Sequence, residues 1–352
     1  MTPNKFQNLR DLSIQKKNEK EAKRLAKEQK QASRPNSFKD KEPLKKVPGS
    51  VPNVGYQAPA PRNDGGFLSR AMNIRISKKE IDQAFIIVPD IHSYVRDIGA
   101  YELCMEAMKV LNDTYNVTKV VQLGDLMECG ELSRHPPSHL QETIPSYMDE
   151  VKWAIDDFWA RSMSACPNAK QIALLGNHEH RVNNWLLEKL GSSKISQDVF
   201  NDLSPTNLYK QMGIQVIPYG NEDAIDGTLN LFSPKGSNIP SLVCVHGWSF
   251  AVNCAKAHLD KMMGATSVIF GHTHRIQSYI RRNPMTNANV GAWNIGALAK
   301  TNMFYQKGIP CDHALAFAVV FTYGDSFEVV TLPILGNTTK HVILPNGAVL
   351  TT

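Results

Sequence analysis

Apolar runs alternate with amphipathic stretches from about residue 74 onward. The run at 84–88 is entirely apolar and predicts a buried strand, whereas residues 99–112 carry apolar side chains at helical spacing and predict a helix. This alternation continues to about residue 190, and mostly strands follow. The order predicts a layered α/β sandwich and argues against a simple doubly wound sheet.

The remaining elements are expected from the same periodicities. Further strands are expected at or near 120–123, 172–175, 214–218, 229–232, 242–246, 267–270, 276–281, 290–295, 315–322 and 326–332, and further helices at 147–165 and about 180–190. The turn-forming pair Asn346-Gly347 predicts a hairpin near the C-terminus. We therefore expect a catalytic domain at 74–335 and a C-terminal hairpin at 336–352.

The first 73 residues lack such a pattern. Residues 15–31 are nearly all Lys, Glu, Arg, Gln and Ala, and six prolines lie between residues 35 and 61. Residues 1–50 hold 14 Lys and Arg against 6 Asp and Glu, a net charge of +8, so the total of +6 leaves −2 for the rest of the chain. We expect residues 1–73 to form a basic, disordered arm and linker, either simply solvated or bound to the phosphate backbone of a nucleic acid.

Composition narrows the class of protein further. The chain has 352 residues, 42% of them hydrophobic, so a sizeable core can be buried. It contains no run of 18 apolar residues and no apolar stretch behind the charged N-terminus, which predicts neither a membrane span nor a secretory signal. The six cysteines are scattered without a C-x-x-C pair, as expected of reduced thiols in the cytoplasm.

Five predicted strands end in side chains that commonly bind metal ions. These strand ends read Asp90-Ile91-His92, Gly124-Asp125, Gly176-Asn177-His178-Glu179, His246-Gly247 and Gly271-His272-Thr273-His274. Open α/β sheets bind ligands just past the carboxyl ends of their strands. In D-x-H and H-x-H, a spacing of two places both side chains on the same side of an extended backbone.

The chemistry of these side chains favours transition metals. Carboxylate, imidazole and amide ligands together suit Mn, Fe, Zn or Ni better than Mg or Ca, and a carboxylate such as Asp125 can bridge two ions about 3.5–4 Å apart. Each segment alone has an ordinary explanation: a Gly-Asp pair is usually a turn, an H-x-H loop is usually on the surface, and His246 could be a core histidine. Five segments in this order, each directly after a strand, predict a two-metal site.

Taken in order, these motifs resemble the calcineurin-like metallophosphoesterase superfamily over about residues 84–275. The resemblance implies an α/β/β/α sandwich of two mixed sheets flanked by helices, and a metal-dependent phosphoric ester hydrolase. It implies that one ion is held by Asp90, His92 and His274, a second by Asn177, His246 and His272, and that Asp125 bridges them. His178 would stabilise the transition state or protonate the leaving oxygen, and the two ions, with Mn the first candidate, would activate water.

The chain departs from the protein Ser/Thr phosphatases of this superfamily, which carry GDxHG and GDxVDRG. Ser93 replaces the glycine of the first motif, and Cys129 stands where the second has its phosphate-binding arginine. Glu128 could still orient His178 as the second aspartate of that motif does.

Other basic residues are candidates for binding the substrate phosphate. Arg134, His135 and Arg181 are three such candidates, although Arg134 is equally well explained as a surface loop arginine, and Arg275 follows the last predicted ligand.

The segment from Gly-Asp to Ser-Arg-His-Pro and the N-H-E-x-R run resemble phage-encoded and bacterial members of the superfamily. Those members are grouped loosely with the nuclease subunits of double-strand-break repair complexes. We therefore expect a phosphodiesterase that acts on nucleic acid, in the host cytoplasm if the chain is phage-encoded. The alternatives are a phosphomonoesterase acting on proteins or small molecules, and a nucleic-acid-binding scaffold with an inactive fold.

Overall fold

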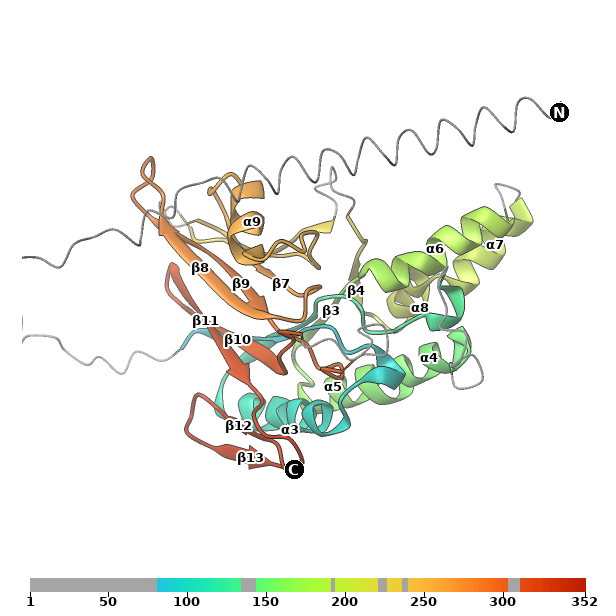
Figure 1. Cartoon of the computed structure of the whole chain (residues 1–352), viewed down its shortest axis with the longest axis horizontal. Coiled ribbons are helices and arrows are strands. Elements are labelled where there is room, and N and C mark those ends of the chain that lie inside the picture. Colours follow the sequence, from blue (N-terminus) through green and yellow to red (C-terminus); the bar gives the residue numbers. More distant parts are fainter. Residues whose placement is uncertain (1–80, 134–143, 191–193, 221–226, 236–239, 303–310) are drawn as a thin grey trace, which may run out of the picture. The chain divides into compact units, whose positions relative to one another are not determined.

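A computed structural model of the chain describes residues 81–133, 144–190, 194–220, 227–235, 240–302 and 311–352 (Figure 1). Every described residue lies in one compact unit, Ser77–Thr352. The predicted basic arm therefore lies outside the described residues. Among those residues, no helix combines the length and the apolar content needed to cross a membrane.

The first sheet has six strands in the order β11-β10-β1-β2-β3-β4. Its strands are β1 (Gln83–Val88), β2 (Val117–Gln122), β3 (Lys170–Leu174), β4 (Gln215–Ile217), β10 (Ala316–Tyr323) and β11 (Ser326–Pro333). Strands β1 to β4 run parallel, whereas β10 and β11 add antiparallel pairings at one side. The carboxyl ends of β1, β2 and β3 therefore lie along the same edge.

The second sheet has five strands in the order β5-β6-β7-β9-β8. Its strands are β5 (Leu229–Phe232), β6 (Leu242–Cys244), β7 (Ser267–Phe270), β8 (Ile276–Arg282) and β9 (Asn289–Ile295). Strands β6, β7 and β9 are parallel, and the two outer strands pair antiparallel to them. This sheet is mixed like the first, and the ends of β6 and β7 share one edge.

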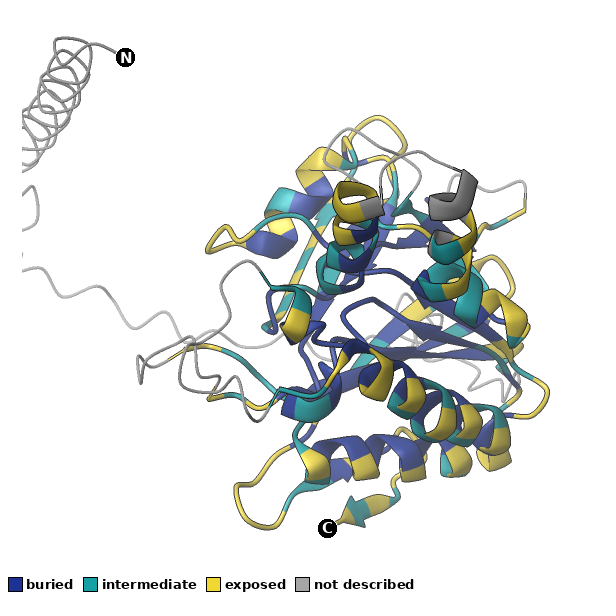
Figure 2. Ribbon diagram, turned by 90° about the vertical axis from the view of Figure 1, so that its right-hand side faces the viewer, coloured by how far each residue is buried: buried dark blue, intermediate teal, exposed yellow. Residues whose placement is uncertain are grey.

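Three apolar clusters hold the layers together. The cluster between the sheets includes Phe85 and Ile87 from β1 and Cys244 and Ile269 from β6 and β7. Another packs α3 (Ile98–Thr114) on the outer face of the first sheet, and a third packs α9 (Cys254–Lys261) on the outer face of the second. Figure 2 shows buried residues in the sheets and on the inward helix faces. The α/β/β/α sandwich predicted from the sequence is confirmed.

The helices differ from the predicted ones at informative places. The helical run predicted at 147–165 consists of α4 (Tyr147–Trp153), a π-helical turn η4 (Ala154–Trp159) and α5 (Ala160–Ala165). Helix α6 (Asn177–Leu190) begins about three residues earlier than expected, so Asn177 and His178 lie on its first turn. The helices α7 (Lys194–Leu203), α8 (Pro205–Gln211) and α9 were not predicted.

The C-terminal segment forms the predicted hairpin. Strands β12 (His341–Ile343) and β13 (Val349–Thr351) pair antiparallel around Asn346-Gly347. Val342 and Leu344 are buried in the cluster that packs α3. This hairpin therefore adds apolar surface to the helical layer that covers the first sheet.

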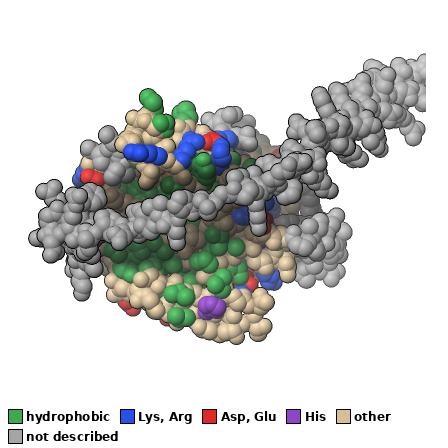
Figure 3. Space-filling view, turned by 60° about the vertical axis from the view of Figure 1, so that its left-hand side comes forward, with side chains coloured by type: hydrophobic (Ala, Val, Ile, Leu, Met, Phe, Trp, Pro, Cys, Tyr) green, Lys and Arg blue, Asp and Glu red, His purple; other side chains and the backbone are tan. Residues whose placement is uncertain are grey.

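The surface of this unit carries both apolar and basic side chains. Figure 3 shows a face on which apolar side chains gather beside a group of Lys and Arg side chains. Strand β8, at the edge of the second sheet, exposes Ile276 and Ile280. Exposed apolar side chains of this kind are common on folded proteins and do not by themselves mark a binding site.

Candidate metal centre

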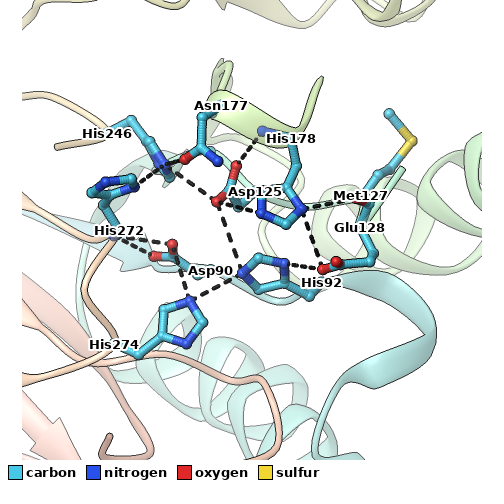
Figure 4. Close-up of polar contacts among 12 residues, drawn as sticks. Asp90, His92, Asp125, Met127, Glu128, Asn177, His178, His246, His272 and His274 are labelled. Atoms are coloured by element: carbon cyan, nitrogen blue, oxygen red, sulfur yellow. Dashed lines mark hydrogen bonds and ion pairs between the residues drawn. The ribbon is translucent and has the colours of Figure 1, made fainter. Parts of the chain in front are cut away.

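The strand ends singled out in the sequence meet at one place (Figure 4). The loop after β1 brings Asp90 and His92, the loop after β2 brings Asp125, and the first turn of α6 after β3 brings Asn177 and His178. The loops after β6 and β7 bring His246, His272 and His274. The two sheets therefore contribute side chains to one site, and all seven predicted metal ligands lie in it.

The backbone is strained where these side chains are presented. His92, Asp125, His272 and His274 all have left-handed backbone conformations, with φ between 53° and 69°. For residues other than glycine such conformations cost of order 1 kcal/mol or more and gather at functional sites. Half of the eight such residues in the described part of the chain are predicted metal ligands.

At two positions of the motifs only glycine fits, because the backbone there lies directly against a carboxylate. A Cβ at Gly176 would lie 2.1 Å from Asp125 Oδ1, and a Cβ at Gly271 would lie 2.1 Å from Asp90 Oδ2. Both distances are far below van der Waals contact, so any side chain would displace a predicted ligand. This explains why glycine begins both the G-N-H-E and the G-H-x-H segments.

One group of possible ligands consists of Asp90, His92 and His274. His92 donates from Nδ1 to Glu128 Oε2 at 2.6 Å, which leaves the lone pair on Nε2. That Nε2 lies 3.0 Å from Nε2 of His274, which in turn lies 3.6 Å from Asp90 Oδ1. Two imidazole nitrogens and a carboxylate oxygen therefore converge on one point.

A second group consists of Asp125, His246 and His272, joined by Asn177. His246 donates from Nδ1 to the carbonyl oxygen of Leu123 at 2.9 Å, so Nε2 is the nitrogen that an ion could take. That Nε2 lies 3.0 Å from Asn177 Oδ1, 3.3 Å from Asp125 Oδ2 and 3.2 Å from His272 Nδ1. Two of the atoms around Nε2 of His246 are thus oxygens that can only accept a hydrogen bond.

Both groups fit divalent cations on chemical grounds. Imidazole nitrogens, carboxylate oxygens and an amide oxygen that converge in this way are the ligand atoms of divalent transition metals, and a cation among them can bind them together. Burial by itself would raise the pKa of Asp125, but the charges of His178 and His246 outweigh it and hold that pKa well below its usual value. Asp125 is therefore an ionised carboxylate that faces both groups, and the side chains of the site could hold divalent metal ions.

His178 forms a third group of possible ligands with His92 and Asp125, and it is held by Glu128 and Arg181. Its Nδ1 donates to the carbonyl oxygen of Glu128 at 2.8 Å and lies 3.2 Å from Glu128 Oε2. Its Nε2 lies 3.8 Å from Asp125 Oδ2 and 3.0 Å from Arg181 Nη2. Burial lowers the pKa of His178, but the charges of Asp125 and Glu128 more than compensate and raise it to about 9.

Two buried carboxylates hold the loops from behind. Glu179 accepts backbone N–H groups of Asp125 at 3.0 Å, Met127 at 2.9 Å and Gly176 at 2.9 Å. Glu150, from α4, accepts the N–H groups of Glu128 at 2.7 Å and Cys129 at 3.1 Å, together with the hydroxyl of Ser93.

Neither of these two carboxylates was identified from the sequence as functional. The sequence offers a clue to Glu179, which is the last residue of the G-N-H-E segment. It offers none to Glu150, which lies on a helix without a motif.

A cavity of about 530 Å³ opens onto the site. Arg181 and Arg275 line it together with Phe250. Arg181 donates to the carbonyl oxygen of Glu128 at 3.2 Å, and Arg275 donates to Asp312 at 2.9 Å. The predicted substrate-binding residues Arg134 and His135 lie outside the described residues.

Comparison with known proteins gives the family of this fold. The calcineurin-like phosphoesterase family model matches residues 84–276, more than half of the chain and the segment that holds all five motifs. The chain belongs to the calcineurin-like phosphoesterase family. The superfamily recognised from the motifs is thereby confirmed.

Solved structures of low identity were also found. Vps29 from Cryptosporidium parvum is 12% identical, with 78% of this chain and 99% of that chain covered and a TM-score of 0.36. Vps29 from Chaetomium thermophilum is 9% identical, with 76% and 94% covered and a TM-score of 0.31. The nuclease MPE from Pseudomonas putida is 14% identical, with 67% and 84% covered and a TM-score of 0.24. The comparison with curated proteins gave no match.

Proposed function

We propose that this calcineurin-like phosphoesterase hydrolyses phosphodiester bonds with the aid of two divalent metal ions, and that its substrate is a nucleic acid. The observation that carries the proposal is the pair of adjoining ligand groups, with Asp125 Oδ2 of the second group 3.8 Å from His92 Nε2 of the first and 3.8 Å from His178 Nε2. An inactive scaffold has no need to maintain four strained residues and two buried anchoring carboxylates at one site.

The seven predicted side chains would hold the two ions. Asp90, His92 and His274 would hold one, Asn177, His246 and His272 the other, and Asp125 would serve both. Divalent ions supply Lewis acidity here: they make water a stronger nucleophile at neutral pH and offset charge on the phosphoryl oxygens. Mn is the first candidate, and Fe, Zn and Ni use the same ligands.

His178 would act on the ester oxygen that leaves. Glu128 fixes the proton of Nδ1 and thereby the orientation of the ring, which leaves Nε2 facing the cavity. From there it can donate a proton or a hydrogen bond to the departing oxygen. Arg181, whose Nη2 lies 3.0 Å from Nε2, would bind a phosphoryl oxygen beside it.

The charges around the cavity favour a diester over a monoester. Among the described residues that line it, Arg181 and Arg275 are the only arginines, and Arg275 is already paired with Asp312. The position that carries a phosphate-binding arginine in protein phosphatases is occupied by the buried Cys129. A phosphodiester carries one negative charge where a monoester carries up to two, so it needs fewer cationic partners.

The basic arm motivates the choice of nucleic acid. Residues 1–50 carry a net charge of +8, and a flexible cationic segment raises the local concentration of a phosphate polymer. Association of this kind weakens steeply with added salt. We place the activity in the cytoplasm, that of the host if the chain is phage-encoded.

The test compares substrates with the protein loaded with Mn²⁺. Bis(p-nitrophenyl) phosphate, p-nitrophenyl phosphate and single- and double-stranded DNA are offered to the wild type and to chains lacking residues 1–66. We expect faster turnover of the diester than of the monoester. Without the arm, we expect the affinity for DNA to fall and to depend less on salt concentration. Two bound ions with no turnover of any ester would contradict the proposal and favour a scaffold.

Two variants test the roles within the site, with ion content measured alongside rate. His178→Ala is expected to lower kcat by about 10²- to 10⁴-fold while both ions stay bound. Asp125→Asn is expected to lower the ion content below two and the rate by on the order of 10³-fold. Glu188→Ala is the control for the first variant, because Glu188 lies on the same helix, is exposed and pairs with Lys189.

A further inference from the structure

Phe250 is a large apolar side chain at the rim of an otherwise polar site. Its side chain is 70% exposed, and it lines the cavity that opens onto the predicted ligands. Its ring centroid lies 4.3 Å from that of His272, with the two rings inclined by 50°. One face of an aromatic ring is thus offered to whatever enters the cavity beside His272.

The backbone that carries Phe250 is held in place on both sides. Arg275 donates to the carbonyl oxygen of Ala251 at 3.1 Å, and Gln277 donates to that of Val252 at 2.9 Å. On the other side, Gly247 adopts a φ of 130° and lies so close to His272 that a Cβ would be 2.7 Å from the Cβ of that histidine. The exposed ring therefore stands on a fixed segment, and ordering it on binding costs little.

The position of Phe250 relative to His178 indicates which part of a substrate it would meet. Figure 4 shows His272 and His178 on opposite sides of Asp125. If His178 acts on the leaving oxygen, the departing group lies on its side of the site. A group beside His272 and Phe250 then belongs to the ester that stays on phosphorus.

We propose that Phe250 binds the substrate by stacking on a nucleobase, or another flat aromatic group, of the ester that is retained. The proposal rests on the proposed function, because it assigns the second ester of the same phosphodiester. Aromatic side chains stack on any base, since each base has a π-face, so this contact would give affinity for nucleotides without sequence preference. Arg275 and Gln277 would be positioning residues for the ring.

The experiment holds the leaving group constant and varies only the retained group. Thymidine 5′-(p-nitrophenyl phosphate) and methyl p-nitrophenyl phosphate both release p-nitrophenolate, and the ratio of their kcat/KM values isolates the contribution of the nucleoside. We expect Phe250→Ala to lower this ratio on the order of 10-fold and Phe250→Leu to lower it nearly as much. Phe250→Trp should keep or raise it.

Val252→Ala is the matched control. Val252 lies two residues further along the same loop, is 88% exposed and does not line the cavity, so its truncation should leave the ratio unchanged. A second measurement avoids turnover altogether: calorimetric binding of thymidine 5′-monophosphate and of methyl phosphate to the Mn²⁺-loaded chain. Phe250→Ala should weaken binding of the nucleotide alone.

The outcomes separate this proposal from the proposed function. If the wild type hydrolyses both esters with equal kcat/KM, the stacking contact is wrong and the phosphodiesterase stands. An equal loss on both esters in Phe250→Ala also overturns it, because the ring would then act only through His272. If neither ester is hydrolysed, the proposed function fails, and unchanged nucleotide binding in Phe250→Ala overturns the stacking contact as well.

Discussion

The two halves of the metal centre are supported in different ways. Behind the half that belongs to the first sheet lie three carboxylates, Glu128, Glu150 and Glu179, which accept backbone N–H groups and histidine protons. Behind the half that belongs to the second sheet lie neutral groups. There Asn294 donates to Thr273 and to Cys254 Sγ, and His258 stacks on Phe270 with ring centroids 3.6 Å apart.

This difference reflects what each half contributes. The loops after β2 and β3 bend sharply and leave N–H groups without carbonyl partners, and carboxylates satisfy several of these at once. Burial raises the pKa of Glu128, but the charges and hydrogen bonds of His92 and His178 outweigh it and lower that pKa to about 2, so the negative charge of Glu128 helps to balance cations at the site. The second half contributes the imidazoles of His246, His272 and His274, and burial together with the charge of His246 lowers the pKa of His272 to about 4. The first half thus supplies the carboxylate ligands Asp90 and Asp125, and the second supplies three imidazoles.

Of the substitutions that test this difference between the halves, replacing Glu179 is expected to have the largest effect, and the effect is on stability. Glu179→Gln puts an amide NH₂ among three backbone donors, so the free energy of unfolding should fall by about 2–4 kcal/mol. Urea denaturation with and without Mn²⁺ measures it. The control is Glu188→Gln on the exposed face of the same helix, which should stay within about 0.5 kcal/mol of the wild type. A Glu179 variant as stable as this control would remove the distinction between the halves.

Replacing Glu150 should affect the chemistry more than the fold. Glu150 holds the backbone at Glu128 and Cys129, and Glu128 in turn contacts His92 and His178. Glu150→Gln should lower Mn²⁺ affinity or kcat/KM by about 10- to 100-fold. Ser93→Ala removes one of the hydrogen bonds to Glu150 and should have a smaller effect. Equal effects of the two variants would show that Ser93, not the carboxylate, positions the loop.

His258 should have the smallest effect at neutral pH, and one that grows in acid. Burial lowers its pKa to about 4, the carbonyl oxygen of Cys254 opposes this, and the charges of Lys261 and His246 add to it. As the pH falls, His258 is protonated in the unfolded chain before it is protonated in the folded one. Its contribution to the free energy of unfolding is therefore complete above about pH 6.5 and is lost as the pH falls toward 4, with about 2 kcal/mol lost at pH 5. His258→Gln should remove this component of the pH dependence. Parallel pH profiles of unfolding for wild type and variant would contradict it.

The sequence predicted the strands and the meeting of the ligands well, because both follow from simple regularities. Apolar runs mark buried strands, and parallel strands bring the residues after them to one edge. The sequence pattern places helix α6 too late, because Asn177 and His178 fit a turn after the strand as well as the first turn of a helix. Glu150 and Phe250 could not be found from the sequence, because their roles come from packing between segments far apart in the chain.

Assembly of the site from both layers has a consequence for folding. His246, His272 and His274 reach their partners only after the second sheet has docked on the first, so neither sheet alone holds a complete set of donors. Ions bound here would cross-link the two sheets of the sandwich, because their ligands come from both. A chelator should then lower the melting temperature of the whole domain cooperatively, and metal content would report whether the sheets have come together.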